Sequence, residues 1–326
     1  MILSILLGYI PAFVYAGFVY WLDRYEKEPL PLLGGVFMWG ALVAAAGAFL
    51  ANTLFGVGIF SLTGSESIAD FTTSAISAPI IEETLKGLAV LLVFFFARQE
   101  FDSILDGVVY AGIAALGFSA TENALYIYQY GYSESGVTGA LGLTFIRVIL
   151  VGWQHPFYTA FFGIGLAVAR ESRSVSTRFL APLAGWLLAI VTHAGHNTLA
   201  SLFSGVGSLL GFIIDWSGWL AMFIFILVMI QRESSWQAEY LKEEVELGTL
   251  TAQQYRTACS ALQRSFAGLG ALTSGKYRQT QRFYQTCAEL VHKKRELARM
   301  GDETGNTAAV TRLRDDLHSL SPFALV

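Results

Sequence analysis

Seven long runs of apolar residues, separated by short polar stretches, fill the first 231 positions of this 326-residue chain. Each run is long enough to cross a bilayer as a helix, which takes about 20 mainly apolar residues. Glycine and proline within such runs are tolerated in a membrane, because neighbouring helices satisfy the backbone groups that they free. The runs cover residues 2–22, 32–60, 72–96, 104–130, 139–169, 179–203 and 209–230. The pattern predicts an all-α polytopic membrane protein of about seven transmembrane helices.

Residues 232–326 follow a different pattern, in which apolar residues such as Leu290, Val291 and Leu297 are spaced three and four apart among charges. This spacing is typical of amphipathic helices, so we expect two or three of them, with glycine-rich turns at 268–275 and 301–305. We therefore divide the chain into a transmembrane domain, residues 1–231, and a soluble helical tail, residues 232–326. The tail is a candidate for docking a cytoplasmic partner, although a solvated appendage is the simpler interpretation.

Composition and charge agree with this division. Hydrophobic residues make up 54% of the chain and charged residues 14%, against roughly 25% charged residues in a typical soluble domain. Residues 1–231 contain 8 Lys or Arg and 14 Asp or Glu, and the tail contains the other 13 and 11. With a net charge of −4 and no basic block, the sequence offers no electrostatic surface for nucleic acid.

Basic residues in the short connections predict the orientation, because basic loops stay in the cytoplasm. Arg24 and Lys27 follow the first run and Arg98 follows the third. Arg170, Arg173 and Arg178 follow the fifth run, and the intervening connections contain neither Lys nor Arg. This alternation predicts an N-terminus outside and a C-terminal tail in the cytoplasm.

Several ionisable side chains interrupt the apolar runs, where each costs several kcal/mol unless it is paired or solvated. A rise of about 1.5 Å per residue places most of them at a similar depth in the outer half of the bilayer, which favours a single site. They are Glu82, Glu83, Lys86, Glu122, Arg147, His155, His193, His196 and Asp215, with Asp106 near a cytoplasmic end.

Four of these residues have a structural interpretation. His196 lies one step off the helix face that His193 and Asn197 share, so we expect it to serve packing. Asp215 is expected in a loop before a seventh helix that begins at Trp216. We expect Arg147 to pair with Glu122 or Glu83 or to extend toward the membrane surface, and Asp106 to cap the helix of the fourth run.

The remaining residues suit hydrolysis of an amide bond in one of two ways. In the first, a buried glutamate acts as the base for water, Lys86 holds the glutamates or keeps one of them ionised, and His and Asn side chains donate hydrogen bonds to the oxyanion. Glu83 points about 100° away from Glu82, so the two carboxylates need not share a role. In the second, two histidines and a glutamate hold a catalytic zinc ion, for which the candidate ligands are His155, His193 and Glu122. No HExxH and no GxSxG motif is present, so neither a zincin nor a serine nucleophile is indicated.

The motifs that contain these residues resemble those of the PrsW family of intramembrane proteases, which is distantly related to the CAAX prenyl proteases. The resemblance covers about residues 15–230. Its elements are DRYEKEP at 23–29, EExxK at 82–86, DGVVYAGIAALGFSATEN at 106–123 with the FxxxE pair Phe118 and Glu122, His155 followed by Gly163, and HxxxN at 193–197.

This resemblance implies an endopeptidase in a bacterial cytoplasmic membrane that cuts a membrane-anchored substrate, such as an anti-sigma factor. It also implies Glu82 as the base and His193 with Asn197 as the oxyanion site. Glu122 stands where the related group has histidine, so its role as a ligand or an orienting residue stays open. PrsW-like proteins are described as metalloproteases, which implies zinc, but a glutamate mechanism without metal stays open as well.

Two other classes of function use the same residue types. A proton-coupled transporter also buries Glu, His and Lys, although no related halves are visible in the sequence. In a non-catalytic membrane scaffold, each charge would be satisfied by its own neighbour. A protease instead requires Glu82 or Glu83, Glu122 and His193 to converge on one wet pocket.

Overall fold

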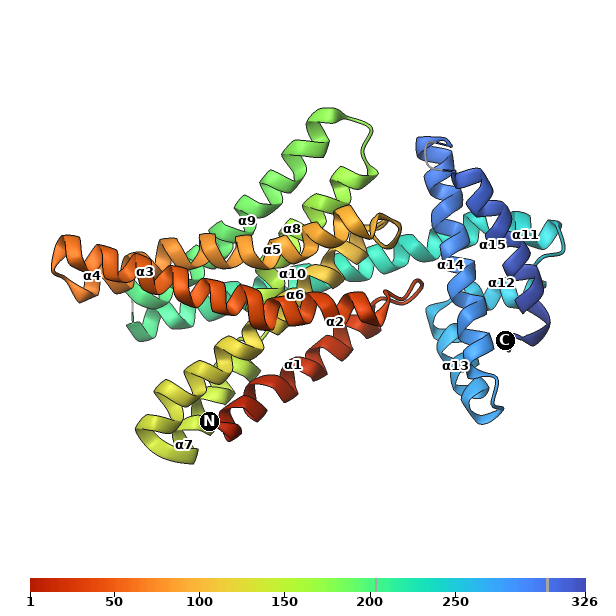
Figure 1. Cartoon of the computed structure of the whole chain (residues 1–326). Helices are drawn as coiled ribbons and strands as arrows, with labels where there is room; N and C mark the ends of the chain where they lie inside the picture. The colour runs from red at the N-terminus through yellow and green to blue at the C-terminus, as the bar shows by residue number, and fades with distance from the viewer. Residues whose placement is uncertain (203, 303–304) are drawn as a thin grey trace. The chain divides into compact units, whose positions relative to one another are not determined.

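The computed structural model describes residues 1–202, 204–302 and 305–326, and every regular element in these ranges is helical (Figure 1). Side chains are not described for residues 203–208, which include the predicted end of the sixth run. The helices of the apolar part are α1 (Ile2–Leu22), α2 (Leu30–Met38), α3 (Ala45–Thr63), α4 (Glu66–Thr72), α5 (Ala78–Phe96), α6 (Ile104–Tyr126), α7 (Ser133–Thr144), α8 (Gln154–Glu171), α9 (Val175–Leu202) and α10 (Ser204–Tyr240). Four π-helical stretches join some of them: η1 (Trp39–Ala44), η2 (Thr73–Ser77), η4 (Ile127–Tyr132) and η5 (Phe145–Leu150).

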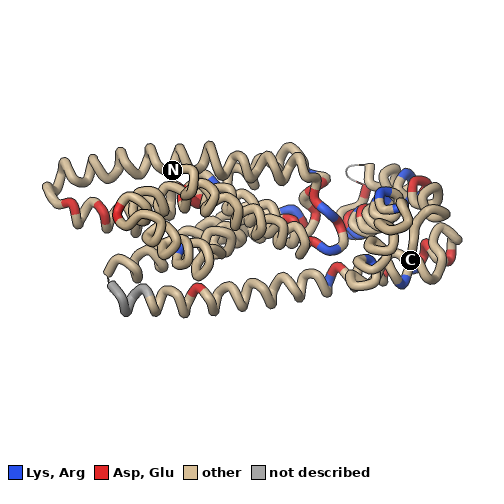
Figure 2. The backbone as a smooth tube through the Cα atoms, turned by 90° about the horizontal axis from the view of Figure 1, so that it is seen from below, with Lys and Arg blue, Asp and Glu red and all other residues tan. Residues whose placement is uncertain are grey.

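Within the described residues, five helical segments are long and apolar enough to cross a membrane: Ile2–Leu22, Leu30–Thr63, Ile104–Glu171, Val175–Leu202 and Leu209–Glu246. Large apolar side chains on these helices face outward, as lipid contact requires, and the backbone traced in Figure 2 carries few charges along them. The expected all-α polytopic membrane protein is therefore confirmed. The count of seven spans stays a prediction. The single segment Ile104–Glu171 contains two of the predicted runs, and α5, which covers most of the third run, carries three charged residues and is not among the five segments.

The sequence pattern predicted one continuous apolar helix at 139–169, but the structure divides this run between α7 with η5 and α8. Helical geometry stops after η5, and α8 begins only at Gln154. Pro156 explains the break, because a proline lacks the N–H that would bond the carbonyl of Gly152 and its ring clashes with that carbonyl. His155 consequently lies in the first turn of α8 and not deep within a long helix.

The chain forms two compact units, of which the first contains Met1–Trp21 and Glu28–Phe225. Helix α6 is the centre of this unit, and nearly all its side chains from Leu105 to Ala120 are buried. Small residues let neighbouring backbones approach α6 closely. A Cβ atom added at Gly107 would lie 2.3 Å from the carbonyl oxygen of Gly163 in α8, and one added at Gly117 would lie 2.0 Å from that of Phe37 in α2. Close packing through small residues is typical of membrane helices.

The N-terminus of α6 is capped as predicted. Asp106 accepts hydrogen bonds from the backbone N–H and the hydroxyl of Ser103, at 2.6 and 2.7 Å, and Ser103 in turn accepts from the backbone N–H of Asp106. This reciprocal capping box satisfies N–H groups that the helix cannot satisfy internally. It fixes the start of the helix that carries Glu122.

The second unit contains Leu22–Lys27 and Ile226–Val326. After the end of α10 it has five helices in the described residues, not the two or three predicted: α11 (Lys242–Glu246), α12 (Ala252–Ala258), α13 (Ala261–Thr273), α14 (Tyr277–Met300) and α15 (Asn306–Leu320). The turn expected at 268–275 is present but shorter than predicted, because α13 continues to Thr273 and the chain turns at Gly275, whose φ is +71°. The turn expected at 301–305 includes residues 303 and 304, which lie outside the described residues.

A compact core and an ion network stabilise this second unit. Phe283, Cys287, Leu290 and Leu317 are fully or almost fully buried in one cluster. The buried Glu244 binds the guanidinium of Arg314 at 2.7 Å and the ammonium of Lys294 at 2.5 Å. Burial acts to raise the pKa of Glu244, but the hydrogen bonds from Arg314 and Lys294 outweigh it and hold the pKa below its usual value.

We expect Gly163→Ala to separate α6 from α8 and to lower the free energy of unfolding by about 1–3 kcal/mol, because the added methyl group meets the Gly107 carbonyl at 2.0 Å. Thermal unfolding in detergent measures the effect. Gly142→Ala is the matched control, since nothing lies within 4 Å of a Cβ there. Equal stability of both variants would contradict the close helix contact.

For the second unit, we expect Glu244→Gln to cost about 2 kcal/mol, less than a fully buried ion pair, because Arg314 is 30% exposed. A depressed carboxyl pKa contributes stability that is present above the unfolded value of 4.5 and is lost as the pH falls through the folded value. Protection of the α14 amides from hydrogen exchange, corrected for the pH dependence of the intrinsic exchange rate, should therefore fall below pH 4.5 in the wild type, with a weaker acid dependence in the variant. The same acid dependence in both proteins would refute this role.

Candidate functional site

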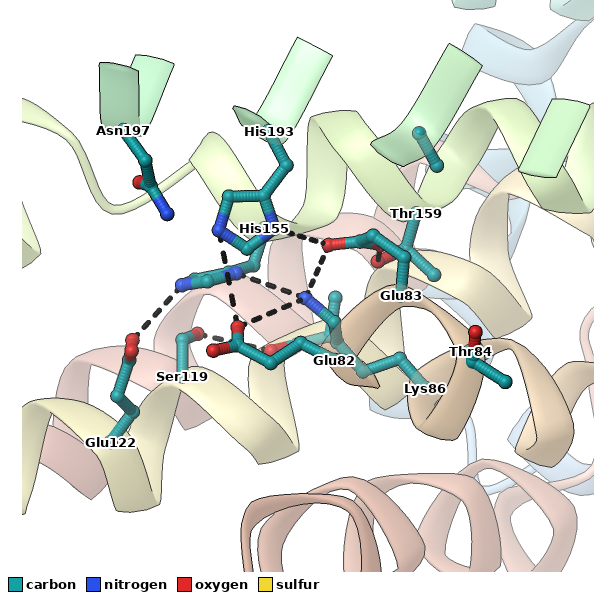
Figure 3. A network of polar contacts seen from close by, with 12 residues as sticks. Glu82, Glu83, Thr84, Lys86, Ser119, Glu122, His155, Thr159, His193 and Asn197 are labelled. Atoms are coloured by element: carbon teal, nitrogen blue, oxygen red, sulfur yellow. Dashed lines mark hydrogen bonds and ion pairs between the residues drawn. The ribbon is translucent and has the colours of Figure 1, made fainter. Parts of the chain in front are cut away.

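Charged and imidazole side chains from four helices of the first unit meet at one place, which Figure 3 shows from close by. Helix α5 supplies Glu82, Glu83 and Lys86, helix α6 supplies Glu122, helix α8 supplies His155, and helix α9 supplies His193. Glu82, Glu83, Lys86 and His193 are each no more than 6% exposed. The structure thus brings together six of the seven residues predicted to be catalytic, which are distant in sequence.

Glu83 is the most fully bonded carboxylate of this group. Its Oε1 accepts from Lys86 Nζ at 2.6 Å and bonds His193 Nδ1 at 2.9 Å, while its Oε2 accepts from the hydroxyl of Thr159 at 2.7 Å. An ionised carboxylate only accepts, so the proton of this imidazole is on Nδ1 and the lone pair of His193 is on Nε2. Glu83 therefore orients His193.

His155 is oriented in the same way by a second carboxylate. Its Nδ1 lies 3.0 Å from Lys86 Nζ and its Nε2 lies 3.0 Å from Glu122 Oε2. Because an ammonium group only donates, Nδ1 accepts and the Nε2–H donates to Glu122. Arg147 holds Glu122 from the other side at 2.9 Å, which confirms the predicted pairing of these two residues.

Phe118, the first residue of the FxxxE motif, packs against the same cluster. Lys86 Nζ lies 4.6 Å from the centre of its ring, and the ring meets His155 edge to face at 5.3 Å. An aromatic face attracts a cation, and more strongly where water is excluded. Phe118 thus helps to hold Lys86 between the glutamates.

Glu82 differs from the other two glutamates. Its Oε2 is buried and makes no hydrogen bond with the described residues, although it lies 3.9 Å from His193 Nε2 and 4.0 Å from Lys86 Nζ. Buried carboxylate oxygens are normally hydrogen-bonded, so an unsatisfied one points to a missing partner such as water or an ion. Glu82 is therefore the residue of this group that is available for chemistry.

The donor set around Glu82 fits a metal ion. One donor atom each from Glu82, His155 and His193 lie within 4.8 Å of one another. Two histidines and a glutamate are a zinc set of metalloproteases, and a carboxylate behind each histidine is the usual outer partner. The sequence predicted Glu122 as the carboxylate ligand, whereas Glu82 occupies that place here and Glu122 bonds Arg147 and His155.

Asn197 lies beside the cluster on α9, one turn beyond His193 (Figure 3). Its amide donates to the carbonyl of Ser74 in η2 at 2.9 Å and makes no described bond to the glutamates. Because an amide nitrogen carries two hydrogens, one donor remains after this bond. The bond to Ser74 fixes the direction of the side chain.

A second buried network adjoins the first and corrects two predictions. Asp215 lies inside α10 and not in a loop, because the helix starts well before Trp216. Its Oδ2 binds His196 Nδ1 and Gln154 Nε2, each at 2.7 Å, so His196 has an acidic partner and is not merely a packing residue. Tyr158 donates to Asp215 at 3.2 Å and stacks on the His193 ring at 5.0 Å.

Sequence reasoning missed three members of these networks, Gln154, Tyr158 and Thr159. A signal was present for Thr159, which follows His155 by four residues and therefore lies on the same face of α8. Tyr158 and Gln154 carried none, because a tyrosine or glutamine within an apolar run is common. Their roles depend on contacts with α9 and α10.

Comparison with known proteins agrees with this geometry. The family described as "PrsW family intramembrane metalloprotease" matches residues 28–230. "Protease PrsW" of Geobacillus kaustophilus is 27% identical over 192 residues, 59% of this chain and 77% of that protein. "Protease PrsW" of Bacillus subtilis is 27% identical over 51% of this chain and 68% of its own length, and that of Clostridioides difficile is 33% identical over 38% and 50%. No solved structure matches the sequence significantly. The matched residues span more than half of the chain and include every member of the cluster, so this protein belongs to the PrsW family of membrane-embedded proteases.

Proposed function

We propose that this protease cleaves a peptide bond of a membrane-anchored substrate with water activated among Glu82, His155 and His193. The observation that carries the proposal is the buried Oε2 of Glu82, which has no hydrogen-bond partner among the described residues and lies 3.9 Å from the free nitrogen of His193. A static ion-pair network would satisfy every buried oxygen, since an unsatisfied one costs about 1–3 kcal/mol.

Glu82, His155 and His193 would hold a zinc ion, with His155 Nδ1 exchanging its hydrogen bond from Lys86 for the metal. When bound, such an ion lowers the pKa of its water and polarises the carbonyl of the scissile bond. Glu83 and Glu122 keep the two imidazoles in the tautomers that direct their lone pairs toward Lys86 and Glu82. Lys86 and Arg147 neutralise those two glutamates, and the second N–H of Asn197 donates to the carbonyl oxygen of the substrate.

The charge count of the cluster supports a cationic partner. Three carboxylates, Glu82, Glu83 and Glu122, face two permanent cations, Lys86 and Arg147. An uncompensated charge inside a membrane protein is costly, so one further positive charge is needed when all three carboxylates are ionised. A divalent metal ion would more than supply it, leaving a net charge of +1, together with the missing contact to Glu82.

We place the second unit on the cytoplasmic side of a bacterial cytoplasmic membrane. Leu22–Lys27, the connection between α1 and α2, belongs to the same unit as the tail. A chain cannot fold into one unit across a bilayer, so both segments lie on one side. The basic residues Arg24 and Lys27 then favour the cytoplasm.

We also propose that the substrate is a membrane-anchored regulatory protein of the anti-sigma factor type. The resemblance of the motifs supports this class. The protein surface itself is apolar around the membrane helices, which suits a substrate that arrives through the bilayer.

Glu82→Gln and His193→Ala should each lower cleavage of a membrane-anchored substrate by roughly a hundredfold or more, because each removes a group that acts on the water. Both should also reduce stoichiometric zinc in the purified protein. Cleavage in reconstituted vesicles and elemental analysis measure the two effects separately.

The matched control is Glu66→Gln, which makes the same substitution at an exposed position in the first turn of α4 and should change neither readout. Full activity in folded Glu82→Gln protein would refute the assignment. Full activity without metal in the wild type would leave Glu82 as the base and remove zinc from the mechanism. Proton-coupled transport without cleavage would favour the transporter class instead.

Tyr158 is expected to position His193, and Asp215 to position Tyr158. Asp215→Ala should leave Gln154, His196 and Tyr158 without their shared acceptor, cost about 2–3 kcal/mol in unfolding free energy, and lower kcat with little change in KM. Ser217→Ala, on the exposed side of the same helix, should do neither. If both variants had the same kcat, Asp215 would have a structural role only.

A further inference from the structure

Helix α13 presents its large apolar residues outward. Leu262, Phe266, Leu269 and Leu272 are each 56–64% exposed, and their spacing of four, three and three residues places them on one face. The opposite face, which packs on the second unit, consists of Ala267, Gly268 and Ala271. A helix that served only the core of this unit would have the reverse arrangement.

Close packing explains why small residues face inward. A Cβ atom added at Gly268 would lie 2.8 Å from the amide nitrogen of Gln281 in α14, and Ala267 and Ala271 are almost fully buried. The unit is therefore complete without the four large side chains. They form a continuous stripe, which we call the α13 stripe, and such exposed apolar patches are typical of interaction sites.

The charged residues in the sequence that contains α13 are all basic, and Asp23, from the connection between α1 and α2, interacts electrostatically with Arg264 of this helix. Between Glu246 and Glu289 the chain has no acidic residue and five basic ones. Four of these are exposed: Arg256, Lys276, Arg278 and Arg282. Lys276 and Arg278 directly follow the end of α13, on either side of the exposed Tyr277.

We propose that the α13 stripe inserts into the surface of a bilayer that contains anionic phospholipids. A helix with one apolar face and only basic charges in its own and the flanking sequence has the features of helices that lie in a membrane interface. Each Lys or Arg near an anionic surface strengthens binding, and an aromatic residue such as Tyr277 suits the headgroup level. A soluble protein partner would require no such uniform charge.

The chain connections make this binding effective. The second unit continues α10, and its segment Leu22–Lys27 is joined covalently to α1 and α2. These connections hold α13 within reach of the membrane surface, so docking is intramolecular and a modest affinity suffices. Lipid composition would then set how much of the second unit is docked.

A depth measurement on the full-length protein in vesicles tests the proposal. A cysteine introduced by Thr273→Cys, at the end of the α13 stripe, is labelled with an environment-sensitive fluorophore in a Cys259→Ser background. Cys287 does not interfere, since it is fully buried and burial raises the pKa of its thiol to about 12. The same label placed by Thr311→Cys on α15 is the positional control.

In vesicles that contain phosphatidylglycerol, nitroxide-bearing lipids should quench the label on α13 and leave the label on α15 unaffected. Lys276→Gln with Arg278→Gln should lower the ratio of docked to undocked protein roughly fivefold per charge removed. Lys242→Gln with Arg312→Gln removes the same charge from exposed positions elsewhere and should have no effect. Phe266→Ser with Leu269→Ser should abolish the quenching.

Three results would overturn the proposal. The first is no quenching of the label on α13 either in vesicles that contain phosphatidylglycerol or in neutral vesicles. The second is equal quenching in neutral vesicles, unaffected by the charge variants. The third is a signal that follows the protein-to-lipid ratio, which would assign the α13 stripe to a second copy of the chain.

Discussion

The cost of charge in an apolar environment governs the whole site. Glu83, Lys86 and His193 are buried among helices that face lipid, and each is tolerable only because the others neutralise or bond it. Glu83 is thereby held by hydrogen bonds from Lys86, His193 and Thr159. Glu122 is occupied in the same way by Arg147 and His155. Among the described glutamates of this cluster, the buried oxygen without a hydrogen bond is Oε2 of Glu82. We therefore assign the reaction to Glu82.

Bringing these charges together depends on how closely the helices approach. The backbones of α6 and α8 almost touch at Gly107 and Gly163, and the same two helices carry Glu122 and His155, which lie 3.0 Å apart. A side chain at either glycine would meet the backbone of the other helix. Interhelical polar bonds in membranes contribute modestly on their own, so packing of small residues must provide the geometry that the polar groups then use. The glycines of the family motifs belong to the site as much as its charged residues do.

The sequence predicted the helical class and the convergence of most site residues because both follow from a strong physical constraint. Long apolar runs predict membrane helices. The ionisable residues within these runs are few, so most of them were expected to meet at a single site. The prediction from the sequence failed where a feature depends on contacts between separate helices or on a single residue within an apolar run. The start of α8 depended on Pro156 within an otherwise apolar run, and the bond between His196 and Asp215 joins two helices. Proposing Glu82 and not Glu122 as the carboxylate that would hold a metal required distances, because the sequence shows equally acidic residues at similar depths.

In residues 232–326, the prediction from the sequence was limited for a different reason. Periodicity found amphipathic helices there, but it assumed that their apolar faces form the core, and on α13 the reverse holds. The second unit also incorporates Leu22–Lys27, in which Tyr25 is 2% exposed and its hydroxyl bonds the carbonyl of Cys259 and the N–H of Ala261. Tyr25 belongs to the DRYEKEP motif, and its hydroxyl holds the chain where α13 begins. The DRYEKEP motif therefore contributes to the packing of the second unit and does not only connect two membrane helices.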